Sequence, residues 1–479
     1  MYEDYAELCI ETASQEGATY VEARFMDYRN RLYTSDGKGV RTQETTEMTF
    51  GVRVIADGMW GFCGSNVTDR ESCRKVAQRA TRIAKIAATA SNRKISLVPT
   101  PTIREEYRNS FQRNPFEVQL SEISDILVTS VKNLRNVSQS IKSATASIAA
   151  FDERKYVETS EGSEISQHII GCGSSLQGVA LAHGRPCRRS YPQSRPGTMT
   201  RGFEQVKEEN LPGEAERIGK EILELTKARK CPSGTTTLIL QDDLLALQIH
   251  ETIGHPTESD RALDTEWDFA GSTFLTPEKL ARLEFGSELV NVVADATIPG
   301  GQGSYGFDDE AVKAKKVDII KNGLFVGYQT SRETAADLKL SESSGAVRGM
   351  TGMHLPLIRM TNINLLPSDW TREEIVEDTK EGVMMISPVM EIFDQRRRTF
   401  TFGGEIGWKI EHGEVTQTLR YPVYNGRTAA FWHSCDAIAK DDWTPRGSGC
   451  GKGRPHQNVR VGHFCSQARF GNVWVGAAI

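Results

Sequence analysis

The feature that most restricts the local structure of this chain is the segment 247–256, which reads Leu-Gln-Ile-His-Glu-Thr-Ile-Gly-His-Pro. Its two histidines, His250 and His255, are five residues apart, so a regular α-helix would place them about 140° out of phase around its axis. Both imidazoles can face one point only if the helix widens into a π-type turn or unwinds before the second histidine. Gly254 and the proline after His255 permit either distortion. We therefore predict a helix from about Asp243 whose last turn is distorted.

The chemistry of this segment suits a metal ion. Two imidazoles with an adjacent carboxylate can hold zinc and supply a general base, which points to hydrolysis of a polar bond such as a peptide. In this interpretation His250 and His255 bind the metal, and Glu251 takes a proton from a zinc-bound water. The alternative is a pair of ordinary histidines at a helix end, one packed and one exposed. The segment by itself lacks a third ligand.

Candidates for the third ligand are the seven remaining histidines, the nine cysteines and many carboxylates. Cys450 stands out because glycines flank it in the run 447–453, where they would let the backbone bring a thiolate close to a metal. The nearby Lys452 would favour the thiolate form. The alternative is a free thiol in a flexible glycine loop. His463 and Cys465 follow closely enough in the sequence to compete for the metal.

These residues resemble those of a known family. The pattern His250-Glu251-x-x-x-His255-Pro-x-Glu258-x-Asp260, followed by Gly449-Cys450-Gly451-Lys452, is similar to the TldD/PmbA family, specifically its metal-bearing TldD-type branch. The resemblance extends over nearly the whole chain through further segments, namely Gly51-Val-Arg53-Val, Trp60-Gly-Phe, Pro299-Gly-Gly-Gln-Gly303-Ser, Asp308-Asp309-Glu310, Arg359-Met-Thr-Asn362 and Phe402-Gly-Gly-Glu405.

The resemblance implies a metallopeptidase in which His250, His255 and Cys450 hold Zn²⁺ and Glu251 is the catalytic base. It also implies a PmbA/TldE-like partner subunit in a heterodimer, with a homodimer as the alternative. Such pairs are thought to degrade unfolded peptides or to trim leader peptides inside an enclosed chamber. Iron or another divalent ion is an alternative to zinc, because the ligand types also suit other metals.

Two departures from the family pattern bear on substrate choice. After Cys450-Gly-Lys the family usually continues with a Gly-Gln turn, whereas this chain has an atypical tail over 453–469 that contains His463 and Cys465. The loop after Glu310 carries Ala311, where a glycine is common. Neither departure removes a proposed ligand.

Length and patterning predict an α+β protein, with an N-terminal mixed α/β domain at 1–228 and a mostly antiparallel β C-terminal metallopeptidase domain at 229–479 that carries the metal-binding helix. Amphipathic patterns predict helices at 3–16, 69–90, 119–134 and 203–227. Turn signals predict hairpins at Lys321-Asn322-Gly323 and around His412-Gly413. The carboxylates Asp308, Asp309 and Glu310 either orient the metal ligands through hydrogen bonds or form a solvated acidic turn.

Composition excludes several classes of function. A net charge of −5 gives no general attraction to nucleic acid or to an anionic membrane. We expect the short basic runs Arg185–Arg189 and Gln395–Arg398 to be solvated loop charges. Nine scattered cysteines without C-x-x-C pairs favour a reducing cytoplasm, and neither a signal peptide nor a membrane anchor is expected.

Three functions of different classes remain open at this point. The favoured one is a zinc-dependent metallopeptidase that acts on unfolded or flexible peptides. The second is a zinc enzyme with a biosynthetic role on a small peptide or amino-acid derivative, which the atypical tail suggests. The third is a non-catalytic regulatory protein, against which the complete ligand set argues.

Overall fold

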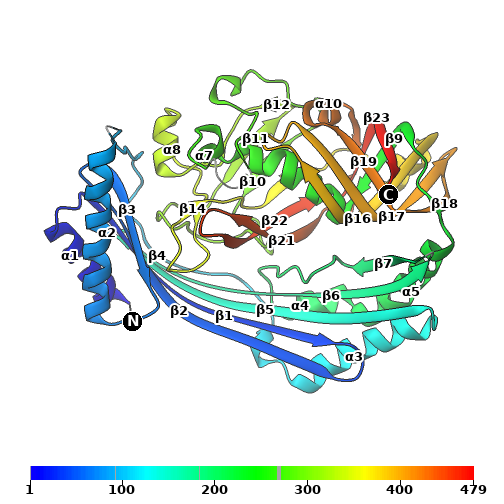
Figure 1. Ribbon diagram of the computed structural model, residues 1–479, viewed down its shortest axis with the longest axis horizontal. Helices are drawn as coiled ribbons and strands as arrows, with labels where there is room; N and C mark the ends of the chain where they lie inside the picture. Colours follow the sequence, from blue (N-terminus) through cyan, green and yellow to red (C-terminus); the bar gives the residue numbers. More distant parts are fainter. Residues whose placement is uncertain (1, 92, 183, 267–270, 479) are drawn as a thin grey trace.

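The computed structural model describes residues 2–478 except 92, 183 and 267–270. Its N-terminal part is built on a seven-stranded sheet with the order β3-β2-β1-β5-β6-β4, in which β7 also pairs with β6. The strands of this sheet are β1 (Tyr20–Ser35), β2 (Val40–Ala56), β3 (Met59–Ser65), β4 (Arg104–Arg108), β5 (Ile141–Thr159), β6 (Glu164–Ala182) and β7 (Arg185–Tyr191). Its long central strands curve beneath the C-terminal part of the chain (Figure 1).

Helices pack against the two ends of this sheet (Figure 1). They are α1 (Glu3–Gln15) and α2 (Arg70–Ala90) at one end, and α3 (Leu120–Asn136), α4 (Glu204–Glu209) and α5 (Leu211–Lys227) at the other. The first pair shares a core with β1 and β2, while α3 and α5 bury their apolar faces on β5 and β6. Each helix offers one apolar stripe to the sheet, as its sequence pattern predicts. The strand β3 approaches α2 closely, since a Cβ at Gly61 would lie 2.0 Å from the carbonyl oxygen of Ala80.

The prediction of a single helix at 203–227 is wrong in one respect. The structure breaks it into α4 and α5 at Asn210, whose φ of 44° lies in the left-handed region. Asn tolerates this conformation better than most residues. Pro212 then occupies the first turn of α5, where a missing N–H costs nothing.

The C-terminal part is dominated by strands, and the predicted α+β class is confirmed. Its largest sheet has eight strands in the order β16-β9-β23-β19-β17-β18-β8, with β20 paired to β23. Because β16 also pairs with β17, five of these strands close into a ring. Pairing is antiparallel except where β16 meets β9 and β18 meets β8. The strands are β8 (Arg229–Lys230), β9 (Gly234–Gln241), β16 (Glu381–Phe393), β17 (Thr399–Glu411), β18 (Glu414–Arg420), β19 (Pro422–Arg427), β20 (Cys435–Ile438) and β23 (Gln467–Ala477).

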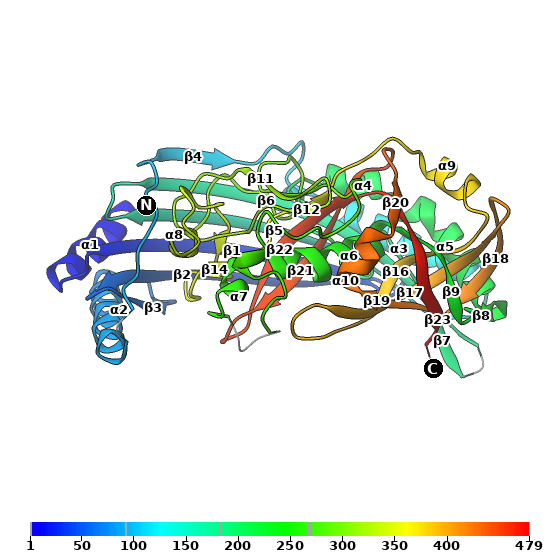
Figure 2. The same ribbon diagram turned by 90° about the horizontal axis from the view of Figure 1, so that it is seen from above.

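The C-terminal part has further strands and helices outside this sheet. The strands are β10 (Val292–Asp295), β11 (Lys316–Lys321), β12 (Leu324–Phe325), β13 (Val347–Arg348), β14 (Leu357–Ile358), β15 (Ile363–Leu365), β21 (Thr444–Lys452) and β22 (Gln457–Cys465). The helices are α6 (Asp242–Ile249), α7 (Ser259–Ala262), α8 (Arg332–Asp337), α9 (Arg372–Glu377) and α10 (Thr428–His433). Figure 2 shows the hairpin β21–β22 crossing the middle of the molecule near α6 and α7, with the two termini towards opposite ends of the long axis.

Both predicted hairpins are confirmed. Lys321 pairs with Leu324 across the turn between β11 and β12, and Glu411 pairs with Glu414 across the turn between β17 and β18. His412 lies in the second turn with a φ of 53°, so this histidine is a turn residue.

The carboxylate cluster 308–310 is buried between the two parts of the chain. Asp309 accepts from Lys155 at 2.8 Å and forms an ion pair with Arg24, both of which project from the N-terminal sheet. Glu310 similarly pairs with Arg53 of β2 at 2.8 Å. The alternative of a solvated acidic turn is therefore wrong. These buried acids join the N-terminal sheet to the C-terminal part. Ala311 follows at a φ of 60°, the conformation for which glycine is the usual choice.

Candidate metal centre

The helix that carries the first two candidate ligands is distorted where the sequence predicts it. The regular helix α6 ends at Ile249, a π-helical turn η2 spans His250–Gly254, and a 3₁₀ turn η3 spans His255–Thr257. The backbone N–H of His255 donates to the carbonyl of His250, five residues earlier. This wider turn brings both imidazoles to one side, and their ring centroids lie 4.8 Å apart.

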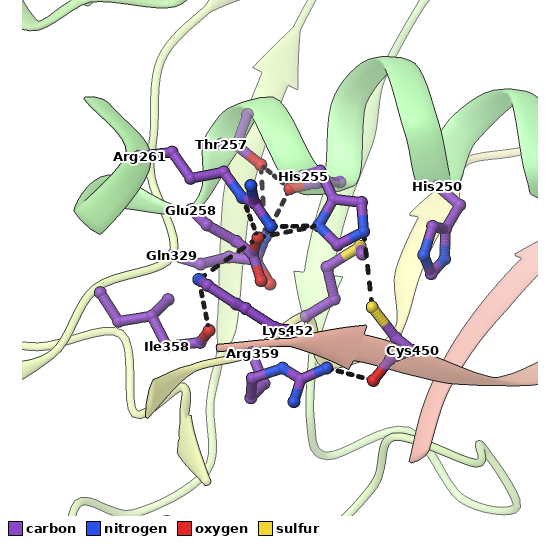
Figure 3. A network of polar contacts seen from close by, with 12 residues as sticks. His250, His255, Thr257, Glu258, Arg261, Gln329, Ile358, Arg359, Cys450 and Lys452 are labelled. Atoms are coloured by element: carbon purple, nitrogen blue, oxygen red, sulfur yellow. Dashed lines mark hydrogen bonds and ion pairs between the residues drawn. The ribbon is translucent and has the colours of Figure 1, made fainter. Parts of the chain in front are cut away.

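Cys450 reaches the two histidines from the hairpin β21–β22. Its Sγ lies 3.4 Å from Nε2 of His255 (Figure 3). One ligand atom from each of His250, His255 and Cys450 lies within 4.8 Å of the others, and all three residues are buried. The run of glycines around Cys450 is an extended strand paired with β22, so the alternative of a flexible glycine loop is wrong. Arg359 braces this strand through contact with the Cys450 carbonyl.

A buried ionic cluster orients His255. Its Nδ1 lies 2.8 Å from Oε2 of Glu258, and that carboxylate also accepts from Nε of Arg261 at 2.7 Å. Lys452 adds a positive charge 3.4 Å from the same oxygen (Figure 3). It also pairs with Asp260 at 2.7 Å. Nδ1 of His255 donates to the carboxylate. In the neutral ring, Nε2 is therefore unprotonated, and its lone pair points at the cysteine sulfur.

A second histidine orients His250. Nδ1 of His463 lies 3.0 Å from the carbonyl oxygen of Ile363 and must donate to it, which leaves Nε2 of His463 as an acceptor. That nitrogen lies 2.8 Å from Nδ1 of His250, which therefore carries the proton. The Nε2 of His250 is left free to bind a metal. Cys465 instead donates to the carbonyl of Asp242 at 3.3 Å, so neither alternative residue belongs to the three-residue cluster.

The electrostatic setting favours the unprotonated forms of His250 and Cys450. Burial, followed by the charge of Arg397, lowers the pKa of His250 to about 3. Burial would raise the pKa of the Cys450 thiol, but the positive charges of Arg359 and of His255 in its imidazolium form outweigh it and lower that pKa to about 6. A neutral imidazole and a thiolate are the forms that bind a metal. The donor set of two imidazoles and a thiolate fits zinc.

Glu251, the proposed base, adjoins this cluster. Its Oε1 lies 4.0 Å from Nε2 of His250, and its Oε2 is in ion-pair contact with Nη1 of Arg397. The sequence assigned Arg397 to a solvated basic run, which is wrong for this residue because its side chain is 2% exposed. Arg189, in the other basic run, is also buried and pairs with Glu405 at 2.9 Å. No sequence signal separates Arg397 from its exposed neighbours Arg396 and Arg398.

Comparisons with known proteins match both parts of the chain. Profiles of the PmbA/TldA metallopeptidase domain 1 and C-terminal domain match residues 21–84 and 233–463. A metalloprotease of Methanocaldococcus jannaschii is 34% identical over 435 residues, which cover 90% of this chain and 91% of that protein. A protein of Saccharolobus solfataricus named a zinc metalloprotease TldD homolog is 25% identical and is covered to 91% of its length, with 90% of this chain aligned.

Solved structures share the fold. A Thermotoga maritima protein described as a modulator of a DNA gyrase superposes with a TM-score of 0.78 at 15% identity, covering 99% of this chain and 100% of that one. TldE from Thermococcus kodakarensis gives a TM-score of 0.75 at 16% identity with the same coverage.

No helix within the described residues is long and apolar enough to cross a membrane. The profiles and the relative at 34% identity together show that this chain belongs to the PmbA/TldD family of metallopeptidases.

Proposed function

We propose that this protein is a zinc-dependent metallopeptidase that hydrolyses unfolded or flexible peptides, either to degrade them or to trim leader segments. The proposal rests on one arrangement. A ligand atom from each of His250, His255 and Cys450 lies close to the others, and Glu251 lies beside them. The names of the relatives, metalloprotease and zinc metalloprotease, support the reaction class.

His250, His255 and Cys450 would hold the zinc ion, with Glu258 and His463 fixing the two imidazoles. When bound, zinc polarises a carbonyl group and makes a bound water more acidic. Glu251 is placed to take a proton from an attacking water and to return it to the departing amine. Its burial keeps bulk water away from that carboxylate.

Extended peptides suit the C-terminal part, which is rich in antiparallel strands. A substrate strand can pair its backbone with a sheet edge, so its affinity depends little on side chains. A compact domain cannot offer such a strand without unfolding. Equal cleavage rates for a folded protein and its denatured form would contradict this substrate class.

We also propose a PmbA/TldE-like partner subunit, since a TldE shares the whole fold. A homodimer is the alternative. Light scattering of the chain alone and after mixing with such a subunit distinguishes the two.

The function is tested by metal analysis of the pure protein together with digestion of a peptide library. We expect about one zinc per chain, as a single three-ligand site requires, and cleavage of library peptides. Glu251→Gln should keep the zinc and lose cleavage, whereas Glu288→Gln, at an exposed position, should change neither. Full activity of Glu251→Gln would refute the assigned base. Release of a modified small molecule without peptide cleavage would favour the biosynthetic alternative.

A further inference from the structure

Arg397 lies at the tip of the hairpin that joins β16 to β17, and its side chain turns inward to the candidate metal centre. The tip is held in one conformation. The backbone N–H of Arg397 donates to Asp394 at 2.9 Å, and the hydroxyl of Thr428 donates to the Arg397 carbonyl at 2.5 Å. The guanidinium lies over the ring of Phe393, with its carbon 3.7 Å from the ring centroid. A φ of 59° at Arg397 directs the chain into this tight turn.

The guanidinium of Arg397 has unused hydrogen-bonding capacity. Its buried Nε makes no hydrogen bond with any of the described residues. Its Nη1 is engaged by Oε2 of Glu251 in an ion pair. A buried donor without a partner costs free energy in general, because the group has lost its hydrogen bonds to water. This open donor belongs to the same guanidinium that contacts the proposed base, where it can bind an oxygen of the substrate.

The field of Arg397 also reaches the metal ligands. Its positive charge contributes to the lowered pKa of His250, and the Cys450 thiolate acts in turn on Arg397. Burial lowers the pKa of Arg397 itself to about 9, so the guanidinium stays protonated at neutral pH. Arg397 is therefore a fixed cation within the same buried space as Glu251 and the ligand cluster.

We propose that Arg397 is a catalytic residue that binds the carbonyl oxygen of the scissile peptide bond and stabilises the negative charge that develops on it. This inference rests on the proposed peptidase function. In the step concerned, the water oxygen bonds to the carbonyl carbon, Glu251 accepts the water proton, and the carbonyl electron pair moves onto its oxygen. The C–N bond then breaks, the oxygen regains its double bond, and the proton passes from Glu251 to the amine. Nε of Arg397 donates to that oxygen while it is negative, and Nη1 adds its positive charge once Glu251 has taken the proton.

The first test compares Arg397→Ala with Arg396→Ala, whose side chain is exposed at the same hairpin tip. Removal of an oxyanion donor lowers kcat by roughly 10²–10³, so we expect that loss with little change in KM or zinc content. Free guanidinium at millimolar concentration should raise the kcat of Arg397→Ala at least tenfold, and the effect should saturate. Ammonium at equal ionic strength should not raise it. Arg396→Ala should behave as wild type. A wild-type kcat for Arg397→Ala, or a loss without guanidinium rescue, would overturn the inference.

The second test does not need turnover. A peptide with a phosphinate in place of the scissile amide presents a negative tetrahedral centre, and its binding to the zinc-loaded protein is measured by calorimetry beside the matched amide peptide. Arg397→Ala should weaken phosphinate binding at least 30-fold and amide binding less than threefold. Equal weakening of both, or no preference for the phosphinate in wild type, would refute the role of Arg397. Absence of cleavage by wild type with this binding pattern intact would instead count against the peptidase proposal alone.

Discussion

His463 lies with its Nε2 2.8 Å from Nδ1 of His250, although 213 residues separate the two in the chain. Its other nitrogen is fixed by the Ile363 carbonyl at 3.0 Å. The pair therefore sets which nitrogen of His250 is available to a metal. The atypical tail after Cys450 supplies this contact, because it folds back as β22 along β21.

Removing this contact should weaken metal binding without unfolding the protein. We expect His463→Ala to lower zinc affinity by roughly 10- to 100-fold, the usual effect of losing a partner that orients a ligand. Competition with a chelator of known affinity measures the change. His412→Asn, at the exposed turn between β17 and β18, is the matched control and should bind zinc as wild type does. An unchanged affinity of His463→Ala would show that His250 needs no orienting partner.

The π-helical turn depends on close packing at Gly254. A Cβ there would lie 2.1 Å from Sδ of the fully buried Met360, so Gly254→Ala must displace one of the two. We expect a loss of about 1–3 kcal/mol in unfolding free energy, with weaker zinc binding because His255 moves. Gly234→Ala has open space around the new methyl group and should be neutral. Thermal melts and zinc titrations of both variants check this, and equal behaviour would show that the turn tolerates the extra atom.

The buried acid Asp309 should hold the two parts of the chain together. Burial would raise its pKa, but Arg24 and Lys155 outweigh this and lower it to about 2. Asp309→Asn leaves buried cations without their counter-charge, and we expect a loss of about 3 kcal/mol in unfolding free energy. Glu342→Gln removes an exposed pair with Lys315 and should cost less than about 1 kcal/mol. Urea denaturation of both variants measures the difference, and similar costs would contradict the role of Asp309.

Stability should fall with rising pH because of Asp243. Burial raises the pKa of this carboxyl from 3.8 to about 7. Between these values the unfolded chain releases the proton while the folded protein keeps it, so the unfolding free energy decreases as pH rises. Asp243→Asn removes this dependence, and its stability relative to wild type should increase by roughly 2–3 kcal/mol from pH 5 to pH 8. Denaturation curves at the two pH values test it. Asp318→Asn, at a partly exposed ion pair, should show no such trend, and a constant difference for Asp243→Asn would contradict the shift.

Local features of the sequence determined the local structure around the first two ligands. The five-residue spacing of His250 and His255, with Gly254 between them, allows few backbone conformations in which both imidazoles meet, and the observed π-helical turn is one of those predicted. The hairpin turns and most helices could be predicted in the same way, because turn residues and hydrophobic periodicity act over a few residues. The break at Asn210 did not, since a left-handed residue leaves no periodic signal.

Tertiary structure alone decided which distant groups complete the centre. Chemistry of the sequence left Cys450 open between a ligand and a loose thiol, and family resemblance favoured the ligand, but only the pairing of β21 with β22 brings its sulfur to His255. The inward turn of Arg397 between two exposed arginines is likewise set by packing of the β16–β17 hairpin. Spacing along a chain fixes short-range geometry, whereas contacts across hundreds of residues depend on how whole sheets pack, which no local pattern encodes.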